Sequence, residues 1–309
     1  MEIRKKLVFG TPNEPKKREC IFFAVKYNHF RDVSTSTALE CRDREDMTEC
    51  ECVLILPDNY TDTGDETPLV MAFHGAGGRV CAADDKTGGV YFMQHAADAG
   101  YAVMDVCGSE KHGTTLGCPE HLLAAYKAYR YVVKHYNVSD RLLLAGSSMG
   151  GQTAMNFANT FPNAVTAVGI FCPRLNMDGV EVDGHYCIGT WDKTEAKNGM
   201  PASRDLIKQN YHIHGDEWDD TNTVGFNPHR TRSFVNADGL RVTMPPCPIK
   251  IWQGTADATV DPVMVQEYVR SVKRGGCYIE LRMLEGVGHT IHPVMEQEIV
   301  MWFNRFTDC

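Results

Sequence analysis

The stretch from Leu142 to Gly151 constrains the fold of this chain more than any other. Its apolar residues 142–145 predict a short buried strand, and Gly146-Ser147-Ser148-Met149-Gly150 fits G-x-S-x-G, a pattern typical of a sharp strand-to-helix turn. The central residue of such a turn has a strained backbone, and the flanking glycines let the strand and the helix approach each other. The pattern therefore predicts that Ser148 Oγ stands exposed at the carboxyl end of a sheet. Alone it also fits a plain small-residue turn, so the serine needs partners elsewhere in the chain.

Short apolar segments alternate with amphipathic segments along most of the sequence. We expect strands at residues 19–27, 50–56, 68–73, 101–106, 141–145, 164–171, 249–253 and 277–284. We expect helices at residues 90–99, 120–135, 149–160, 262–273 and 293–306. This alternation is typical of an α/β protein with a doubly wound, mostly parallel sheet.

Residues 174–246 break the alternation. The segment is polar, rich in His, Trp, Asp and Asn, and shows no clear periodicity. A region of that length without its own pattern is usually functional rather than a plain connection. We therefore expect an α/β core made of residues 1–173 and 247–309, with residues 174–246 inserted as a cap or lid.

A serine hydroxyl becomes a useful nucleophile when an imidazole accepts its proton and a carboxylate orients that imidazole. Asp257 follows the predicted strand 249–253, and His289 follows the predicted strand 277–284, so both are expected at the same edge of the sheet as Ser148. Asp261 is the rival acid, but it immediately precedes Pro262 and suits a helix cap. His292 precedes Pro293 in the same way and is expected to point elsewhere.

A negatively charged reaction intermediate also needs backbone N–H donors that face it. The Met149 N–H is the expected first donor, because it follows Ser148 directly. The glycine-rich loop His74-Gly75-Ala76-Gly77-Gly78 follows the predicted strand 68–73, and Ala76, or else Gly75, is the expected second donor. The loop lacks the lysine and the glycine spacing of nucleotide-binding loops, so a nucleotide is not expected.

Taken together, these motifs resemble the α/β-hydrolase superfamily, and within it esterases related to polyhydroxybutyrate depolymerases and to feruloyl or acetyl-xylan esterases. The resemblance covers residues 50–173 and 247–307 and rests on residues 56–60, 74–78, 138–150, 254–257 and 288–289. It implies a serine esterase that hydrolyses a short-acyl or aryl carboxylic ester, including a carbohydrate-linked one, through an acyl-enzyme and without a cofactor. A serine peptidase or aminoacyl hydrolase, and a non-catalytic binding protein of the same fold, are the alternatives.

The predicted cap contains aromatic residues and a cluster of possible metal ligands. Trp191, Trp218 and Tyr186 either form an aromatic wall for the substrate or pack the cap onto the core. His212 and His214 stand beside several acidic residues, but no closed four-ligand spacing appears, so no metal is expected.

Composition limits the partners and the setting. The net charge of −9 argues against a nucleic-acid-binding surface. The chain has 12 cysteines without a C-x-x-C pair, which favours reduced thiols, although Cys107 and Cys118 bracket one loop and would suit a disulfide in an oxidising compartment. Residues 1–10 lack the apolar core of a signal peptide, and no segment is long enough to span a bilayer, so we expect a cytoplasmic protein without a membrane partner. The sequence does not set the oligomeric state.

Overall fold

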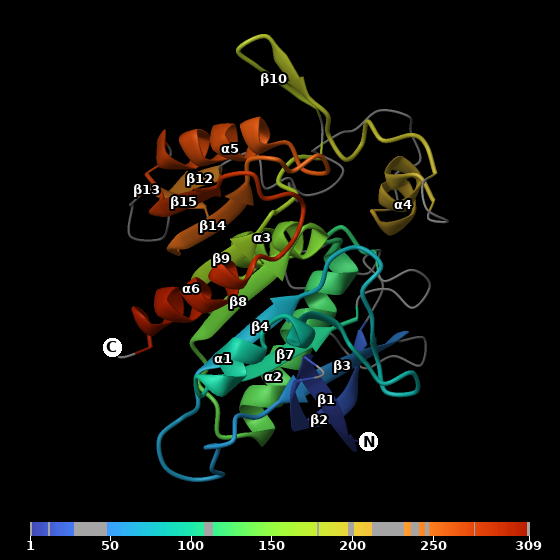
Figure 1. Cartoon of the computed structure of the whole chain (residues 1–309), viewed down its shortest axis with the longest axis vertical. Coiled ribbons are helices and arrows are strands. Elements are labelled where there is room, and N and C mark those ends of the chain that lie inside the picture. Colours follow the sequence, from blue (N-terminus) through green and yellow to red (C-terminus); the bar gives the residue numbers. More distant parts are fainter. Residues whose placement is uncertain are drawn as a thin grey trace.

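A nine-stranded mixed sheet runs through the molecule (Figure 1). The computed structural model describes residues 2–11, 13–27, 48–107, 114–177, 179–196, 201–211, 232–235, 241–244, 247–274 and 276–307. In spatial order the strands are β1 (Ile3–Thr11), β2 (Glu14–Tyr27), β3 (Thr48–Ile55), β7 (Ala102–Val106), β4 (Leu69–Phe73), β8 (Leu142–Ser147), β9 (Val165–Phe171), β14 (Ile249–Gly254) and β15 (Ile279–Leu284).

The sheet is parallel from β7 to β15 and antiparallel at its other end, where β1, β2, β3 and β7 pair in sequence. Every residue of β4 and of β7 is buried. Strands that are covered on both faces read as continuous apolar runs, which explains why the sequence pattern located them. The predicted doubly wound, mostly parallel sheet is therefore confirmed.

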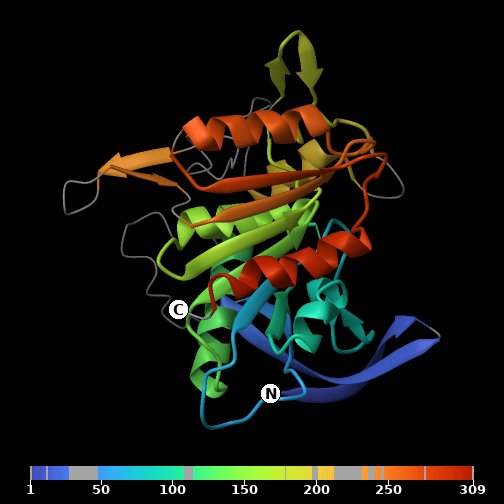
Figure 2. The same ribbon diagram turned by 60° about the vertical axis from the view of Figure 1, so that its left-hand side comes forward.

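Helices cover both faces of the sheet. Helices α1 (Gln94–Asp98) and α6 (Pro293–Asn304) contact each other, as do α2 (Pro119–His135) and α3 (Met149–Thr160). Neighbouring residues of β9 show that α3 and α6 lie on opposite faces, because successive side chains of a strand alternate. A side chain at Gly169 would collide with Ile299 of α6, whereas the next residue, Ile170, packs beside Gly151 of α3. Figure 2 shows α6 in front of the strands.

The structure confirms four predicted helices to within a few residues, namely those at 120–135, 149–160, 262–273 and 293–306. The helix predicted at 262–273 is α5 (Pro262–Arg274). The helix predicted at 90–99 is wrong in extent, because a 3₁₀ turn (Gly88–Tyr91) precedes the short helix α1. Two contacts explain the difference. The Gly89 N–H donates to the buried Asp105 carboxylate, and a side chain at Gly89 would meet the Ala72 carbonyl oxygen at 1.7 Å. The segment is thus pinned against the sheet before a helix can begin.

The described parts of residues 174–246 form small elements outside the sheet. They are the hairpin β10 (Val180–Val182) and β11 (His185–Cys187), the helix α4 (Ser203–Asn210), and the hairpin β12 (Arg232–Val235) and β13 (Arg241–Met244). The β10–β11 hairpin projects beyond the rest of the molecule in both views (Figures 1 and 2). This segment interrupts the chain between β9 and β14, which are neighbours in the sheet.

Neither a disulfide nor a membrane-spanning helix occurs in the described part of the chain. Cys107 and Cys118, the one pair that the sequence suggested, are both buried and form no disulfide. No helix among the described residues combines the length and the apolar character needed to cross a bilayer.

Candidate active site

Ser148 lies in the sharp turn between β8 and α3. Its backbone has φ 55° and ψ −117°, a positive-φ conformation that costs a non-glycine residue about 1–3 kcal/mol. The flanking glycines make this turn sterically possible. A side chain at Gly146 would lie 2.3 Å from the Gly150 carbonyl oxygen, and one at Gly150 would lie 2.0 Å from the carbonyl oxygen of Phe73. The glycine spacing read from the sequence is thus required by backbone-to-backbone contact.

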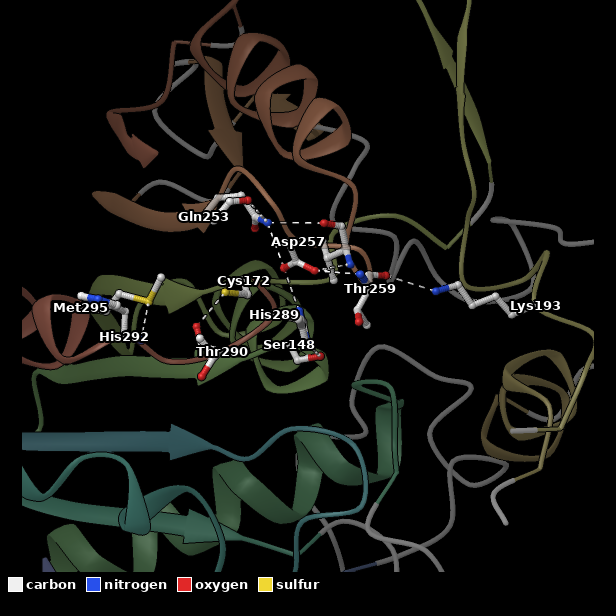
Figure 3. A network of polar contacts seen from close by, with 12 residues as sticks. Ser148, Cys172, Lys193, Gln253, Asp257, Thr259, His289, Thr290, His292 and Met295 are labelled. Carbon is white, nitrogen blue, oxygen red and sulfur yellow. Dashed lines mark hydrogen bonds and ion pairs between the residues drawn. The ribbon is translucent and has the colours of Figure 1, made fainter. Parts of the chain in front are cut away.

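A continuous hydrogen-bond chain joins Ser148, His289 and Asp257 (Figure 3). The distance from Ser148 Oγ to His289 Nε2 is 3.0 Å, and the distance from His289 Nδ1 to Asp257 Oδ2 is 2.8 Å. Asp257 Oδ2 can only accept when ionised, so Nδ1 carries the proton and Nε2 is left to accept from the serine hydroxyl. The three residues predicted from strand exits thus lie together in an order suited to proton transfer.

The Asp257 carboxylate is held by four hydrogen-bond donors. Oδ1 accepts from the backbone N–H of Thr259 at 2.8 Å and of Val260 at 2.9 Å, while Oδ2 accepts from His289 and from Gln253 Nε2 at 3.0 Å. Burial raises the pKa of Asp257, but the bonds from Val260, His289 and Thr259 outweigh it, so this pKa lies below its ordinary value. The carboxylate therefore stays ionised at neutral pH although it is buried.

The rival residues Asp261 and His292 take up helix-capping positions. Asp261 Oδ1 accepts from the Val263 N–H at 2.9 Å at the start of α5, and its other oxygen lies 2.6 Å from His185 Nε2. His292 Nδ1 accepts from the Val294 N–H at 3.3 Å at the start of α6. Neither residue is part of the hydrogen-bond chain that ends at Ser148.

Ser148 and His289 open onto a cavity of about 1040 Å³, and the predicted oxyanion residues Gly75, Ala76 and Met149 line the same cavity. A side chain placed on Gly75 would contact Ser148 Cβ at 3.7 Å, so this loop passes directly beside the serine. The Gly78 N–H closes a tight turn on the Gly75 carbonyl oxygen at 3.0 Å. The loop after β4 and the N-terminus of α3 therefore both border the part of the cavity that contains Ser148.

His74 anchors that loop to the sheet. Its Nδ1 lies 2.7 Å from Asp105 Oδ2, and both side chains are buried. Asp105 stands in β7, and it also accepts from Gly89, so one carboxylate fixes two segments. The loop is thereby held in place before any substrate arrives, which is what electrostatic stabilisation of a developing charge requires.

Known structures share this architecture at low sequence identity. An S-formylglutathione hydrolase from Agrobacterium tumefaciens matches with a TM-score of 0.60 and 14% identity, over 94% of this chain and 96% of that one. Est1E from Butyrivibrio proteoclasticus matches with a TM-score of 0.52 and 15% identity, over 84% of this chain and 96% of that one. A putative dipeptidyl aminopeptidase IV from Bacteroides ovatus gives a TM-score of 0.59 and 14% identity over 93% of this chain, which spans 35% of that protein.

The chain has the α/β-hydrolase fold. No protein-family model matches its sequence, and no curated protein matches it either. The order and direction of the strands identify the fold, and the fold alone does not define the chemistry of the site.

Where the structure describes them, the aromatic residues singled out in the sequence do not line the cavity themselves but contact residues that do. Trp191 is buried and packs with Met149 and Leu206, with the Arg204 guanidinium 5.1 Å from its ring centre. Tyr186 is exposed on β11, and its hydroxyl donates to Asp192 at 3.0 Å. In the part of the chain that the structure describes, neither Trp191 nor Tyr186 is among the residues that line the cavity. Trp218 lies outside the described residues.

Two residues beside the site were not found from the sequence. Gln253, buried at the end of β14, orients Asp257. Cys172 follows β9 with φ 43°, and its Sγ donates to the Thr290 carbonyl oxygen at 3.3 Å (Figure 3). Burial, together with the Asp257 charge, raises the pKa of Cys172 to about 11, so the thiol is uncharged at neutral pH. A polar residue at the carboxyl end of a strand is the signal that would have pointed to Gln253.

Among the residues that the structure describes, two groups of side chains have the composition of metal ligands. Cys172, Asp257 and His289 form one, and His185, Cys187 and Asp261 form the other, with ligand atoms within 4.8 Å of one another in each group. The first group uses the atoms that already bond within the Ser148 chain, so an ion there would interrupt it. His212 and His214, the residues weighed as ligands from the sequence, lie outside the described residues.

Proposed function

We propose that this α/β-hydrolase is a serine esterase that cleaves carboxylic esters through an acyl-enzyme intermediate. The observation that carries the proposal is the hydrogen-bond chain from Ser148 Oγ through His289 to Asp257, with 3.0 Å and 2.8 Å links. The resemblance of the fold to an S-formylglutathione hydrolase and to Est1E supports it.

The first half of the reaction forms an ester between the acyl group and Ser148. His289 Nε2 takes the hydroxyl proton as Oγ attacks the carbonyl carbon of the substrate, and the resulting imidazolium is stabilised by the ionised Asp257. The same Nε2 proton then passes to the alcohol oxygen as the bond between carbonyl carbon and alcohol breaks. The alcohol leaves and the acyl group stays on Ser148.

The second half removes the acyl group with water. His289 Nε2 accepts a proton from a water molecule that attacks the acyl carbon, and it returns that proton to Ser148 Oγ as the acid leaves. In both halves the carbonyl oxygen becomes negatively charged. The N–H groups of Met149 and Ala76, with Gly75 as the alternative, are proposed to bind it. The loss of one such donor typically costs about 10²–10³ in kcat.

Residues 174–246 are proposed to act as the cap that selects the substrate. Thr194, Ser203 and Leu206 of this segment border the cavity that contains Ser148, which supports the proposal. Hydrophobic packing of Trp191 and Tyr211 against Met149 and Leu116 holds the cap on the core. A small soluble or carbohydrate-linked ester is the proposed substrate class, since the cap carries many polar residues.

A fluorophosphonate probe tests the nucleophile. Wild-type protein should be labelled at Ser148, and Ser148→Ala should not be labelled, because only an oxygen activated by His289 attacks phosphorus at a useful rate. Ser147→Ala is the matched control, since it removes the neighbouring hydroxyl, and it should still be labelled. Equal labelling of wild type and Ser148→Ala would contradict the assignment of the nucleophile.

A peptidase of the same fold is the second candidate. The fold resemblance to a putative dipeptidyl aminopeptidase IV supports it, although this chain spans only 35% of that protein. Hydrolysis of 4-nitrophenyl acetate and of an aminoacyl 4-nitroanilide separates the two. An esterase should cleave the acetate far faster, whereas comparable or faster cleavage of the anilide would favour the peptidase.

A further inference from the structure

Arg174 brings a positive charge to the cavity that contains Ser148. It follows Cys172-Pro173 at the end of β9, and its backbone N–H donates to the Ser148 carbonyl oxygen at 3.0 Å. Its side chain is partly buried and lines the same cavity as Ser148 and His289. The backbone of Arg174 is therefore hydrogen-bonded to the residue that would attack the substrate, and its side chain lies at the same cavity.

The guanidinium lacks an anionic partner in the described part of the chain. Its side-chain hydrogen bond is to a neutral group, from Nη1 to Thr190 Oγ1 at 3.3 Å. Asp257 attracts it, but that carboxylate is already occupied by four donors. Asp192, an acidic residue that lines the same cavity, has its Oδ2 occupied by the Tyr186 hydroxyl at 3.0 Å and the Gly189 N–H at 2.8 Å. Several guanidinium N–H groups are therefore left for a ligand.

The position of this guanidinium is fixed in advance. Thr190 is fully buried, and its hydroxyl donates to the Asn176 carbonyl oxygen at 2.9 Å, so its lone pairs face Arg174 Nη1. The Thr190 N–H bonds to the same carbonyl oxygen at 3.4 Å. An arginine held in this way has lost part of its side-chain freedom before binding, which strengthens recognition of an anion.

We propose that Arg174 binds a carboxylate carried by the ester substrate, so that the enzyme prefers anionic esters. The inference rests on the proposed esterase function. A guanidinium recognises a carboxylate through two parallel N–H···O bonds, and such charge-assisted bonds are stronger in a partly buried cavity than in water. The Lys193 side chain, which lines the same cavity, adds a second positive charge near its wall.

Two pairs of esters test the proposal, with the carboxylate on either side of the scissile bond. The acyl pair is mono(4-nitrophenyl) glutarate and 4-nitrophenyl pentanoate. The alcohol pair is 4-acetoxybenzoate and its methyl ester. In at least one pair, wild-type kcat/KM should favour the charged member, and Arg174→Gln should lower the charged-to-neutral ratio by about 10- to 100-fold, the range for a lost hydrogen bond to a charged group. Arg174→Lys should keep part of the preference.

Arg270→Gln is the matched control. It removes the same charge from α5, where Arg270 pairs with Glu267 at 2.9 Å on the protein surface, and it should leave the ratio as in wild type. If Arg270→Gln lowers the ratio equally, the net charge of the protein rather than Arg174 sets the preference, and the proposal is overturned.

The remaining outcomes separate this inference from the proposed function. If the wild-type protein cleaves none of the four esters, the proposed esterase function is contradicted. If the esters are cleaved but Arg174→Gln changes the charged-to-neutral ratio of kcat/KM by less than twofold in both pairs, the proposed role of Arg174 is wrong. The proposed esterase function is then unaffected. If Arg174→Gln loses all activity, a binding experiment replaces the kinetic one. Saturation-transfer NMR then measures whether monomethyl glutarate binds to the Ser148→Ala variant. This binding should disappear when Arg174→Gln is added, while Arg174→Lys retains it, and equal binding by all three variants refutes the proposal.

Discussion

Ser148, His289 and Asp257 differ in how closely their surroundings hold them. The strongest restraint is at Asp257, which accepts from two backbone N–H groups, Gln253 and His289. A carboxylate restrained in this way keeps the His289 ring in a single orientation and stabilises the imidazolium formed during the reaction.

Replacing Asp257 should therefore act through the histidine. Asp257→Asn presents an amide that can donate to Nδ1, so His289 would hold its proton on Nε2 and could no longer accept from Ser148. We expect kcat on an aryl ester to fall by about 10⁴. Asp261→Asn, in the helix cap of α5, is the matched control and should stay within a few-fold of wild type. A loss below tenfold in Asp257→Asn, or a similar loss in both variants, would contradict the assignment.

Single residues were predictable where their chemistry and their place after a strand coincide. Ser148, Asp257 and His289 satisfy both conditions, so they were found from the sequence, and the structure brings them together. Cys172 and Arg174 also follow a strand, but their relevance depends on which side chains from distant segments face them. A single sequence carries no record of those contacts.

At the scale of elements, the turn between β8 and α3 meets the end of β4 through backbone atoms at Gly150. The Phe73 carbonyl oxygen occupies the space that a side chain on Gly150 would need. Because neither side of this contact is a side chain, it cannot relax by a change of rotamer.

Gly150→Ala should consequently destabilise the protein by about 3 kcal/mol or more, since the added carbon would lie 2.0 Å from the Phe73 oxygen. Gly288→Ala is the control, because its added carbon would meet only the Ala256 oxygen at 3.8 Å, and it should change stability by less than about 1 kcal/mol. Urea unfolding curves of the two variants and wild type measure both values. Similar midpoints for all three proteins would refute the steric explanation.

Helices and strands were predictable where the spacing of apolar residues and the residues typical of an element's ends indicate the same segment. Helix α2 begins with Pro119 and carries apolar residues on its inner face, and α3 begins directly after Ser148 in the G-x-S-x-G turn, so both were located within a residue or two. The segment 88–98 resisted prediction because Gly89 is held by Asp105 and Ala72, which are distant in sequence. Residues 174–246 were not predicted because the elements described there, two short hairpins and the short helix α4, leave little periodicity in the sequence.

At the scale of the whole molecule, the folding equilibrium is coupled to a buried histidine. His121 of α2 accepts from the Thr115 hydroxyl at 2.6 Å and donates to the Val106 carbonyl oxygen at 3.0 Å. Burial, aided by His74, lowers the pKa of His121 to about 3. The native state therefore keeps this ring neutral under conditions in which the unfolded chain protonates it.

The protein should consequently become less stable as the pH is lowered. A histidine in the unfolded chain has a pKa of about 6.5, whereas the pKa of His121 in the native state is about 3. Between these two pH values the unfolded chain binds more protons than the native state. The free energy of unfolding therefore decreases by up to about 1.4 kcal/mol for each pH unit by which the pH is lowered. Above pH 6.5 the effect vanishes. His121→Gln should flatten this dependence in urea unfolding measured from pH 7 to pH 4. Parallel pH profiles for wild type and variant would show that His121 does not contribute.

The order of the strands along the chain also has a consequence for synthesis. Ser148 and His289 are 141 residues apart, so at a translation rate of about 5–20 residues per second the histidine is added about 7 to 28 s after the serine. When Ser148 is added, β14 and β15, which extend the same sheet and precede the acid and the base, have not yet been made. A ribosome-bound chain that ends before residue 257 thus carries Ser148 without Asp257 and His289, and the serine can pass its proton to His289 only after β14 and β15 have joined the sheet.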